Sequence, residues 1–420
     1  MIIPSIDVMG GQTVQLVGGR EKALDAGDPV PLAGTFRLAG EIAVIDLDAA
    51  IGSGENAALL ERVLPVAPCR VGGGIRSVEA AIRWLDAGAA KVILGTAARL
   101  EILERLPPGR VIAALDAEHD DIVVEGWRRK TGARVVDRMK ELRGHVGGFL
   151  VTFVEREGRL GGIDMDRVKE LADAAGDARL TIAGGVTTLE EIAACDRLGV
   201  DAQVGMAIYT GRMALADAIA APLVSDRPDG LWPTVVADER GAALGLAWSD
   251  LESLREAVRR RQGVYHSRKR GLWVKGATSG ATQELLRIDL DCDRDALRFT
   301  VRQRGGFCHA GTRTCWGDDL GLGALMRTLE ARVQDAPAGS YTRRLLDDPA
   351  LLKEKLLEEA GELAAASSKD DVAWEAADVV YFAMVAMAKA GVTLDDVERV
   401  LDRRALKVTR RPGDAKPDKA

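Results

Sequence analysis

The chain has 420 residues, of which 47% are hydrophobic and 29% are charged, and its net charge is −7. This length exceeds what one compact core usually holds, and the negative charge disfavours a general nucleic-acid or membrane-surface binder. No apolar run reaches the roughly 18–20 residues that a membrane-spanning helix needs, and five unevenly placed cysteines fit a reducing compartment better than a disulfide framework. We therefore expect a cytoplasmic protein of two or three domains that binds neither nucleic acid nor membranes.

Residues 1–224 alternate short β-branched runs with runs rich in Ala, Leu and Arg. Eight strands that alternate with helices over this length are typical of a parallel (βα)8 barrel. The expected strands are residues 2–6, 42–47, 69–71, 91–94, 111–115, 150–153, 180–182 and 202–204.

An internal repeat runs through this region. I-P-S-I-D at 3–7 resembles I-A-A-L-D at 112–116, V-G-G-G-I-R-S at 71–77 returns as I-A-G-G-V-T-T at 182–188, and I-L-G-T-A at 93–97 returns as Q-V-G-M-A at 203–207. Two half-barrels would give this nearly constant spacing, with offsets of 109, 111 and 110 positions, whereas a doubly wound sheet has no reason to show it.

The ends of the expected strands carry the candidate barrel site. Glycines at strand ends let backbone N–H groups approach a phosphate closely, and two such groups suit a ligand with a phosphate at each end. Asp7 and Asp116 end strands 1 and 5, so they should face each other across the mouth and could share acid and base work. Turns and helix caps are the competing interpretation of these residues. The candidate phosphate contacts are Gly73, Gly74, Gly95, Gly184, Gly185 and Gly205.

Residues 1–224 resemble the ProFAR isomerase barrel of histidine biosynthesis, which converts ProFAR to PRFAR by an Amadori rearrangement. The matching pieces are I-P-S-I-D-V-M-G-G, V-I-D-L-D-A-A, V-G-G-G-I-R-S, and A-L-D-A followed by E-G-W. The resemblance implies that Asp7 acts as base and Asp116 as acid. The family usually has D-G-T after strand 6, where this chain has Glu157, Gly158 and Arg159. A barrel retained as scaffold or regulator is therefore the alternative.

Residues 228–318 should form a β-rich α+β domain, because strand-like runs occur at 234–237, 285–289 and 296–301 after the turn-rich linker 225–230. Alternating carboxylates are hard ligands suited to Mg²⁺, and they would share one face if 291–295 is a strand. Thiolates suit Zn²⁺, and three of them leave a fourth position for water, as at catalytic zinc sites. His309 could relay a proton. The candidate ligands are Asp291, Asp293 and Asp295 for magnesium, and Cys292, Cys308 and Cys315 for zinc.

This region resembles phosphoribosyl-AMP cyclohydrolase, which opens the adenine ring at the N1–C6 bond. The matching pieces are R-P-D-G-L, Y-H-S-R-K-R-G-L-W-V-K-G-A-T-S-G, D-C-D-R-D-A-L, G-F-C-H and T-C-W-G. The resemblance implies the same zinc and magnesium ligands, from one chain or two, and a catalytic role for His309. It also implies substrate contacts at Arg268, Trp273, Lys275, Thr278 and Ser279.

Residues 320–412 have helical periodicity and an acidic pattern, E-E-x-x-E at 358–362 followed by E-x-x-D at 375–378. Residues three and four apart share a helix face, so two adjacent helices could direct these carboxylates at one magnesium ion that holds a polyphosphate. A solvated acidic face is the competing interpretation.

The acidic pattern resembles that of the all-α nucleotide pyrophosphohydrolases, and G-S-Y-T-R-R-L, W-E-A-A-D-V-V-Y-F and R-R-A-L-K-V-T-R-R narrow it to phosphoribosyl-ATP pyrophosphohydrolase. The resemblance implies a homodimer, with Lys353 and Lys355 as phosphate contacts. The implied catalytic residues are Glu358, Glu359, Glu362, Glu375 and Asp378, of which the last four bind magnesium.

The three resemblances name consecutive steps on phosphoribosyl nucleotides: pyrophosphate release from phosphoribosyl-ATP, adenine ring opening to ProFAR, and isomerisation to PRFAR. This order favours one enzyme for all three steps. The alternatives are a bifunctional hydrolase with an inactive barrel, a zinc-dependent hydrolase of the nucleotide pool, and a metal-stabilised binding module.

Overall fold

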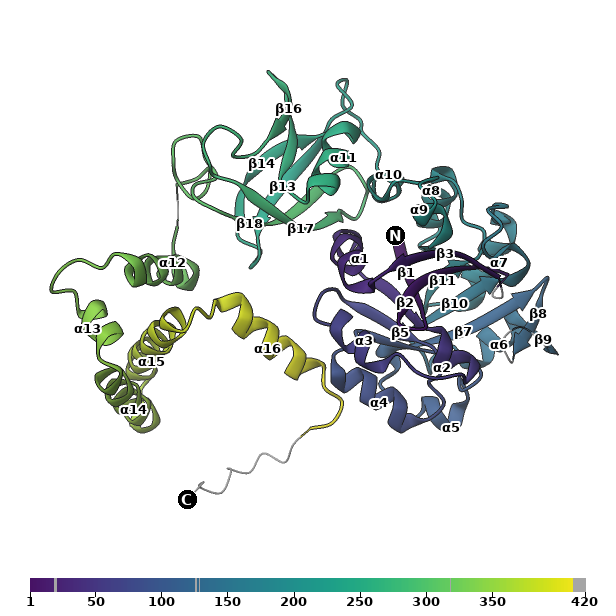
Figure 1. The fold of residues 1–420 in the computed structure, drawn as a ribbon, viewed down its shortest axis with the longest axis horizontal. Helices are drawn as coiled ribbons and strands as arrows, with labels where there is room; N and C mark the ends of the chain where they lie inside the picture. The colour runs from purple at the N-terminus through teal and green to yellow at the C-terminus, as the bar shows by residue number, and fades with distance from the viewer. Residues whose placement is uncertain (19–20, 125–126, 128, 318, 411–420) are drawn as a thin grey trace. The chain divides into compact units, whose positions relative to one another are not determined.

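A computed structural model of the chain describes residues 1–410, except 19–20, 125–126, 128 and 318. Two compact units are present, one formed by Met1–Gly305 together with the segment that starts at Leu406, the other by Gly306–Ala405 (Figure 1). The three-domain division at 224–228 and 318–320 stays a prediction, because the units separate only after Gly305. Residues 411–412 of the third predicted domain, and Glu125 and Gly126 of the E-G-W motif, lie outside the described residues.

The first unit contains the predicted closed parallel barrel, and all eight expected strands are confirmed. The strands follow the order β10-β11-β12-β1-β4-β5-β6-β7, and β7 pairs with β10 to close the ring, with Asp116 beside Thr152. The interior is filled by aliphatic side chains such as Ile93, Ile112 and Leu150, each of which contributes about 1.5–3 kcal/mol when fully buried. The barrel strands are β1 (Ile2–Met9), β4 (Ile42–Asp46), β5 (Cys69–Gly72), β6 (Lys91–Leu94), β7 (Val111–Glu118), β10 (Gly148–Phe153), β11 (Arg179–Ala183) and β12 (Asp201–Val204).

Helices connect the barrel strands and begin at residues suited to capping. Ser77 caps α4 through the Ala80 N–H, and Thr188 forms a capping box with Glu191 at the start of α8; such a cap stabilises a helix by about 1 kcal/mol. The barrel helices are α1 (Pro29–Phe36), α2 (Leu47–Ile51), α3 (Ala57–Val63), α4 (Val78–Ala87), α5 (Leu100–Leu103), α6 (Val135–Leu142), α7 (Met165–Ala175), α8 (Leu189–Arg197), α9 (Met206–Tyr209) and α10 (Leu215–Ala220), with 3-10 turns η1 (Arg37–Ala39), η2 (Pro108–Arg110) and η3 (Val154–Arg156).

The two half-barrels share an extra feature that matches the sequence repeat. After β1 the chain forms the antiparallel strands β2 (Gln12–Val17) and β3 (Glu21–Gly27), and after β7 it forms β8 (Asp121–Val124) and β9 (Arg129–Arg134). Strands 1 and 5 of the barrel therefore each continue into a hairpin. Both hairpins rise from the carboxyl ends of their strands, where barrel sites are found.

The β-rich domain belongs to the same unit as the barrel, and its predicted strands are confirmed. One sheet has the order β14-β13-β18-β17, and a separate hairpin pairs β15 with β16. Tyr265 and Phe299 are fully buried between these layers. The elements are β13 (Trp232–Asp238), β14 (Ala243–Ser249), α11 (Leu251–Arg260), β15 (Val264–Ser267), β16 (Gly271–Val274), β17 (Gln283–Leu290) and β18 (Leu297–Gln303).

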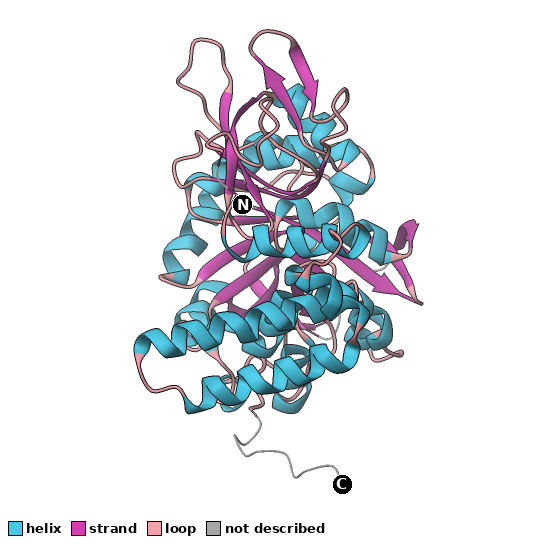
Figure 2. Cartoon of the chain, turned by 90° about the vertical axis from the view of Figure 1, so that its left-hand side faces the viewer, coloured by secondary structure: helices cyan, strands magenta, loops and turns pink. Residues whose placement is uncertain are grey.

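The second unit is helical, as Figures 1 and 2 show. Its core contains Leu329, Leu345, Leu352, Phe382 and Val385. Among the described residues no single helix is long and apolar enough to cross a membrane, and Lys369–Ala390 with Leu394–Leu406 passes that test only as a pair bent by 107°. The helices are α12 (Gly321–Gln334), α13 (Tyr341–Asp347), α14 (Pro349–Ala365), α15 (Lys369–Lys389) and α16 (Leu394–Leu406).

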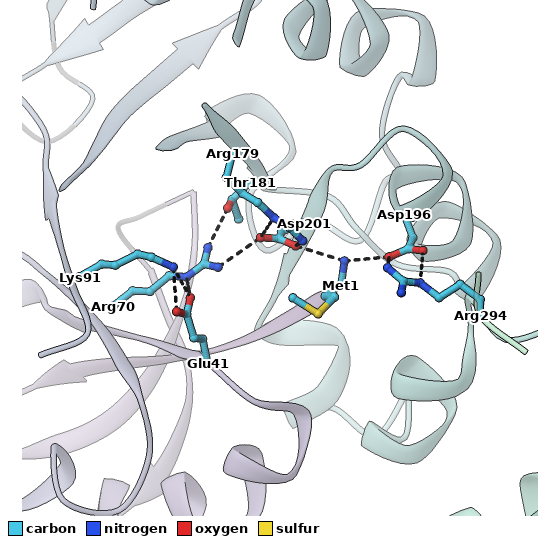
Figure 3. Close-up of polar contacts among 9 residues, drawn as sticks. All are labelled: Met1, Glu41, Arg70, Lys91, Arg179, Thr181, Asp196, Asp201 and Arg294. Atoms are coloured by element: carbon cyan, nitrogen blue, oxygen red, sulfur yellow. Dashed lines mark hydrogen bonds and ion pairs between the residues drawn. The ribbon is translucent and has the colours of Figure 1, made fainter. Parts of the chain in front are cut away.

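A network of ion pairs closes the amino-terminal end of the barrel (Figure 3). Asp201, which is fully buried, accepts hydrogen bonds from Arg70 at 3.1 Å and from Arg179 at 2.6 and 3.0 Å. Arg70 also pairs with Glu41 at 2.6 Å. Burial opposes ionisation of Asp201, but the hydrogen bond from Arg179 and the surrounding cations lower its pKa to about 2. This end of the barrel is therefore a charged, tightly paired layer, opposite the face that carries the candidate site.

Candidate active sites

Three carboxylates gather at the carboxyl end of the barrel. Asp7 lies on β1, Asp116 on β7 and Glu157 after η3. Burial raises the pKa of Asp7 to about 7, and burial together with the charges of Asp7 and Asp116 raises the pKa of Glu157 to about 8. Strands β1 and β7 lie on opposite sides of the ring, so Asp7 and Asp116 come from opposite walls. Asp7 and Glu157 can therefore exchange protons near neutral pH.

Asp116 has partners that the sequence did not reveal. The Trp127 indole Nε1 donates a hydrogen bond to Asp116 Oδ2 at 2.8 Å, and the Thr152 hydroxyl donates another. Burial nevertheless raises the pKa of Asp116 above its usual range. Tyr209 lies near Asp7, and its hydroxyl donates to the Ser5 carbonyl at 3.1 Å. Thr152 lies beside Asp116 because β7 pairs with β10 where the barrel closes. The local sequence does not reveal this pairing of distant segments.

One predicted group of glycines lines a pocket in the mouth. Gly184, Gly185 and Gly205 line it together with Ser5 and Glu157. At Gly184 the backbone has φ +81°, and a Cβ atom would lie 2.5 Å from the Phe153 carbonyl oxygen, so only glycine fits. The open N–H groups of these strand ends can receive an anionic oxygen.

The equivalent glycines of the first half-barrel show the same construction. At Gly73 the backbone has φ +95°, and a Cβ atom would lie 2.1 Å from the Asp46 carbonyl oxygen, while a Cβ at Gly74 would meet Ala49 at 2.6 Å. Gly95 ends β6 with open space beside it. The repeat therefore places close-packed glycine pairs on both sides of the mouth.

Arg159, which replaces the usual threonine, is exposed. Its Nη2 atom lies 4.0 Å from the Cβ position of Gly18, at the end of the β2 strand. Among the described residues that line the pocket are Glu157, Gly158 and Leu160, but not Arg159.

The D-C-D-R-D segment is a loop and not a strand, so its aspartates do not share one face of a strand as expected. β17 ends at Leu290 and β18 begins at Leu297, and Arg294 has the left-handed φ of +68°, which breaks the extended course. The tight turn still brings carboxylate oxygens of Asp291, Asp293 and Asp295 within 4.8 Å of one another. A hydrogen bond with Asp291 and the charge of Asp293 raise the pKa of Asp295. Such crowding of hard oxygen ligands fits a divalent cation.

The three cysteines of the zinc prediction fall in both units. Cys292 is exposed in the loop formed by residues 291–295, which belongs to the first unit. In the second unit Cys308 and Cys315 lie within hydrogen-bonding reach of each other, and the Ala310 N–H is the main cause that lowers the pKa of the Cys308 thiol. His309 Nδ1 lies 3.8 Å from Cys308 Sγ. The lowered pKa favours the thiolate form of Cys308, and a thiolate beside a second thiol suits a soft metal ion.

The predicted substrate contacts of the β-rich domain surround the β15–β16 hairpin. Lys275 is buried, and its Nζ lies 6.0 Å from the centre of the Trp273 ring. Arg268 is exposed and stacks over Trp248 at 5.1 Å, with Arg227 also over that ring at 4.1 Å. Thr278 and Ser279 are exposed in the following turn. Trp248 was not predicted as a site residue, because its ring contacts Arg227 and Arg268 from two other segments of the chain.

The acidic pattern of the second unit lies on two helices that pack side by side, α14 and α15. Carboxylate oxygens of Glu359, Glu375 and Asp378 lie within 4.8 Å of one another. Burial and the charges of Glu362 and Glu359 raise the pKa of Glu375. Glu358 instead pairs with Lys355 at 2.8 Å, outside this three-residue group. Lys355 also holds Glu359 at 2.9 Å, whereas Lys353 is exposed.

Family comparisons divide the chain into three segments. The model of the family "Histidine biosynthesis protein" matches residues 1–214, that of "Phosphoribosyl-AMP cyclohydrolase" matches residues 245–317, and that of "Phosphoribosyl-ATP pyrophosphohydrolase" matches residues 322–405. Each matched segment contains one of the carboxylate or thiol clusters described above.

Curated relatives carry similar names. A histidine biosynthesis trifunctional protein of Neurospora crassa is 40% identical over 349 residues, which cover 81% of this chain and 38% of the relative. One of Komagataella pastoris is 52% identical over 207 residues, covering 49% of this chain and 25% of the relative. A phosphoribosyl imidazole-4-carboxamide isomerase of Methanocaldococcus jannaschii is 34% identical over 232 residues, covering 52% of this chain and 98% of the relative. The chain spans between a quarter and a half of the length of the first three multifunctional relatives.

Proposed function

The chain belongs to the family of histidine biosynthesis proteins, and we propose on this premise that it carries out three consecutive steps of histidine biosynthesis. The helical unit releases pyrophosphate from phosphoribosyl-ATP, the β-rich domain opens the adenine ring of phosphoribosyl-AMP, and the barrel isomerises ProFAR to PRFAR. The observation that carries this proposal is the coincidence of each family match with its own cluster of acids or thiols.

In the barrel, the glycine pockets hold the two phosphates of ProFAR at opposite sides of the mouth. Asp116 gives a proton to the ribose ring oxygen, which opens the ring, and Asp7 removes the proton from C2′ so that the aminoaldose becomes an aminoketose. Both acids have raised pKa values because of burial, as a proton-transferring pair requires near neutrality. The absence of Arg159 from the described residues that line the glycine pocket supports an active barrel over a scaffold.

The rate of isomerisation should depend on pH in a bell shape. Asp7 must be ionised to act as base, so the rate rises through its pKa of about 7. Asp116 must stay protonated to act as acid, so the rate falls where it ionises, and burial raises that pKa above its usual range. The measurement is kcat/KM for ProFAR between pH 5.5 and 9.5. In Glu157→Gln the alkaline limb should move to lower pH, because the negative charge that Glu157 acquires above its pKa of about 8 no longer helps Asp116 to keep its proton. An unmoved limb would exclude this role for Glu157.

In the β-rich domain, Asp291, Asp293 and Asp295 fit magnesium by the closeness of their oxygens. Cys292, Cys308 and Cys315 are the proposed zinc ligands, and the lowered pKa of Cys308 supports them. When bound, zinc would activate water for attack at C6 of the adenine ring. Lys275 and Arg268 orient the nucleotide, and His309 moves the proton that the N1–C6 cleavage requires.

Replacing Cys308 by alanine should abolish ring opening and leave pyrophosphate release unchanged. The substitution removes one of three thiolates from the proposed zinc site, and loss of a ligand strongly weakens a three-ligand site. Zinc content by elemental analysis and conversion of supplied phosphoribosyl-AMP are the measurements. Cys195→Ala, at a buried barrel thiol, is the matched control and should change neither. Full zinc content in Cys308→Ala would contradict the ligand assignment.

In the helical unit, Glu359, Glu362, Glu375 and Asp378 would hold magnesium, which neutralises polyphosphate when bound. Water attacks the α-phosphorus of phosphoribosyl-ATP, and pyrophosphate leaves from the α–β bridge. Glu358, which pairs with Lys355 at 2.8 Å, would orient this water, and Lys353 and Lys355 would contact phosphate. Exposed Leu357 and Trp374, at 64% and 73% exposure, support a homodimer through this unit. We place the enzyme in the cytoplasm, without nucleic-acid or membrane partners.

The test supplies each substrate separately to the purified chain with Mg²⁺ and Zn²⁺. Phosphoribosyl-ATP should give pyrophosphate, phosphoribosyl-AMP should give ProFAR, and ProFAR should give PRFAR. Failure of one conversion alone would remove that step from the proposal and leave the other two.

A further inference from the structure

Arg294, in the middle of the metal loop 291–295, has a backbone conformation that side-chain-bearing residues rarely adopt. Its φ is +68°, the left-handed region that favours glycine. The loop depends on this conformation, because it turns the chain so that the N–H groups of Asp295 and Ala296 reach Asp291 Oδ1 at 3.0 and 3.1 Å. The same turn brings the three aspartates together.

The side chain of Arg294 is held by the barrel. Its Nε and Nη2 atoms donate to Asp196 Oδ2 at 2.7 Å and Oδ1 at 3.0 Å, as Figure 3 shows. Asp196 lies in the last turn of α8, and its side chain is only 8% exposed. Arg294 Nη1 also donates to the Asp291 carbonyl, and the Arg294 carbonyl accepts a hydrogen bond from Val224 N at 2.8 Å. Two charged groups in bidentate contact fix both distance and orientation.

We propose that Arg294 is a positioning residue, and that its ion pair with Asp196 of the barrel holds the metal loop of the β-rich domain in its cation-binding shape. The inference rests on the proposed magnesium site. Without the anchor, Arg294 would relax to an ordinary backbone conformation, and the mutual repulsion of Asp291, Asp293 and Asp295 would spread the loop. The barrel thus supports the neighbouring reaction in addition to its own.

A second barrel contact offers a matched control. Arg255 of α11 donates to both oxygens of Asp217 of α10, at 2.6 and 3.0 Å. This pair also joins the barrel to the β-rich domain with bidentate geometry, but it does not involve the metal loop. Loss of the Asp217 pair therefore reports general weakening of the contact between the two domains.

The experiment titrates Mn²⁺, a paramagnetic substitute for Mg²⁺, into the full chain and follows free Mn²⁺ by electron paramagnetic resonance. Glu359→Gln and Glu375→Gln are present throughout to silence the helical cluster. Asp196→Asn should weaken Mn²⁺ binding about tenfold, the effect of losing one partly buried charged pair, while Asp217→Asn should bind as the parent does. Arg294→Gly removes the anchor but adopts the left-handed φ without strain, so it should weaken binding less than Asp196→Asn does, and Asp196→Asn added to it should have no further effect.

Unchanged Mn²⁺ affinity in Asp196→Asn would overturn the inference, as would equal weakening by Asp217→Asn. A further loss when Asp196→Asn is added to Arg294→Gly would also overturn it, because Asp196 would then act independently of Arg294. A parent that binds no Mn²⁺ would instead refute the proposed metal site itself, and the inference with it.

Discussion

Glu359→Gln should abolish pyrophosphate release from phosphoribosyl-ATP, with a loss of about 10³-fold or more, since a first-sphere carboxylate both binds the cation and sets its position. Glu359 is the buried member of the acidic group on α14 and α15, where its oxygen lies within 4.8 Å of those of Glu375 and Asp378. Glutamine keeps the volume but removes the charge. The measurement is pyrophosphate release at saturating Mg²⁺, with ring opening of supplied phosphoribosyl-AMP as the second assay.

Glu354→Gln is the matched control for this prediction. Glu354 is exposed on the same helix α14, so its replacement should leave pyrophosphate release within about twofold, as for most surface substitutions. If Glu359→Gln retained substantial pyrophosphate release, Glu359 could not be an essential ligand. Loss of both reactions in Glu359→Gln would indicate misfolding or a shared site.

Asp7→Asn should abolish conversion of ProFAR to PRFAR and spare both hydrolytic reactions. An amide cannot remove the C2′ proton, and loss of a general base costs about 10²–10⁴-fold. Asp25→Asn is the control, because Asp25 is exposed and accepts hydrogen bonds from Lys22 Nζ at 2.7 Å and from Gly27 N at 3.1 Å. Isomerisation should be followed directly with supplied ProFAR, and a fully active Asp7→Asn would exclude Asp7 as the base.

The unfolding temperature of Asp7→Asn distinguishes loss of the general base from misfolding of this variant. The pKa of Asp7 is about 7 in the folded chain against an ordinary value of 3.8. The folded chain therefore binds the proton of the Asp7 carboxyl more tightly than the unfolded chain does. The contribution of Asp7 to the free energy of unfolding therefore falls as pH rises from about 4 to about 7. An uncharged asparagine side chain carries no such penalty, so Asp7→Asn should unfold at a higher temperature than the parent at pH 8.5. A lower unfolding temperature at that pH would contradict the burial of an ionised Asp7.

The barrel could be predicted from the sequence because its strands are short β-branched runs separated by amphipathic helices. The internal repeat also indicated that the two halves of the barrel have the same construction. The D-C-D-R-D segment shows where periodicity fails. Alternation of carboxylates suggested a strand, but the left-handed turn at Arg294 depends on Asp196, which lies 98 positions away in the sequence. Local pattern cannot report a conformation that a distant domain stabilises.

Some residues of the candidate sites could also be predicted from the local sequence, whereas others could not. Asp7, Asp116 and the glycine pairs could be predicted because they stand at strand ends, whose positions follow from the fold. Trp127 could not, because the hydrogen bond from its indole to Asp116 depends on the tertiary structure. Glu157 was not predicted as a site residue, because its charge interaction with both aspartates depends on how the barrel strands assemble.

The most direct test of the whole account is to give the purified chain phosphoribosyl-ATP with Mg²⁺ and Zn²⁺ and to separate the products by chromatography. Three active sites on one chain predict pyrophosphate and PRFAR as end products, with ProFAR appearing only transiently. Accumulation of ProFAR without PRFAR would contradict an active barrel and leave a bifunctional hydrolase whose barrel supports the metal loop.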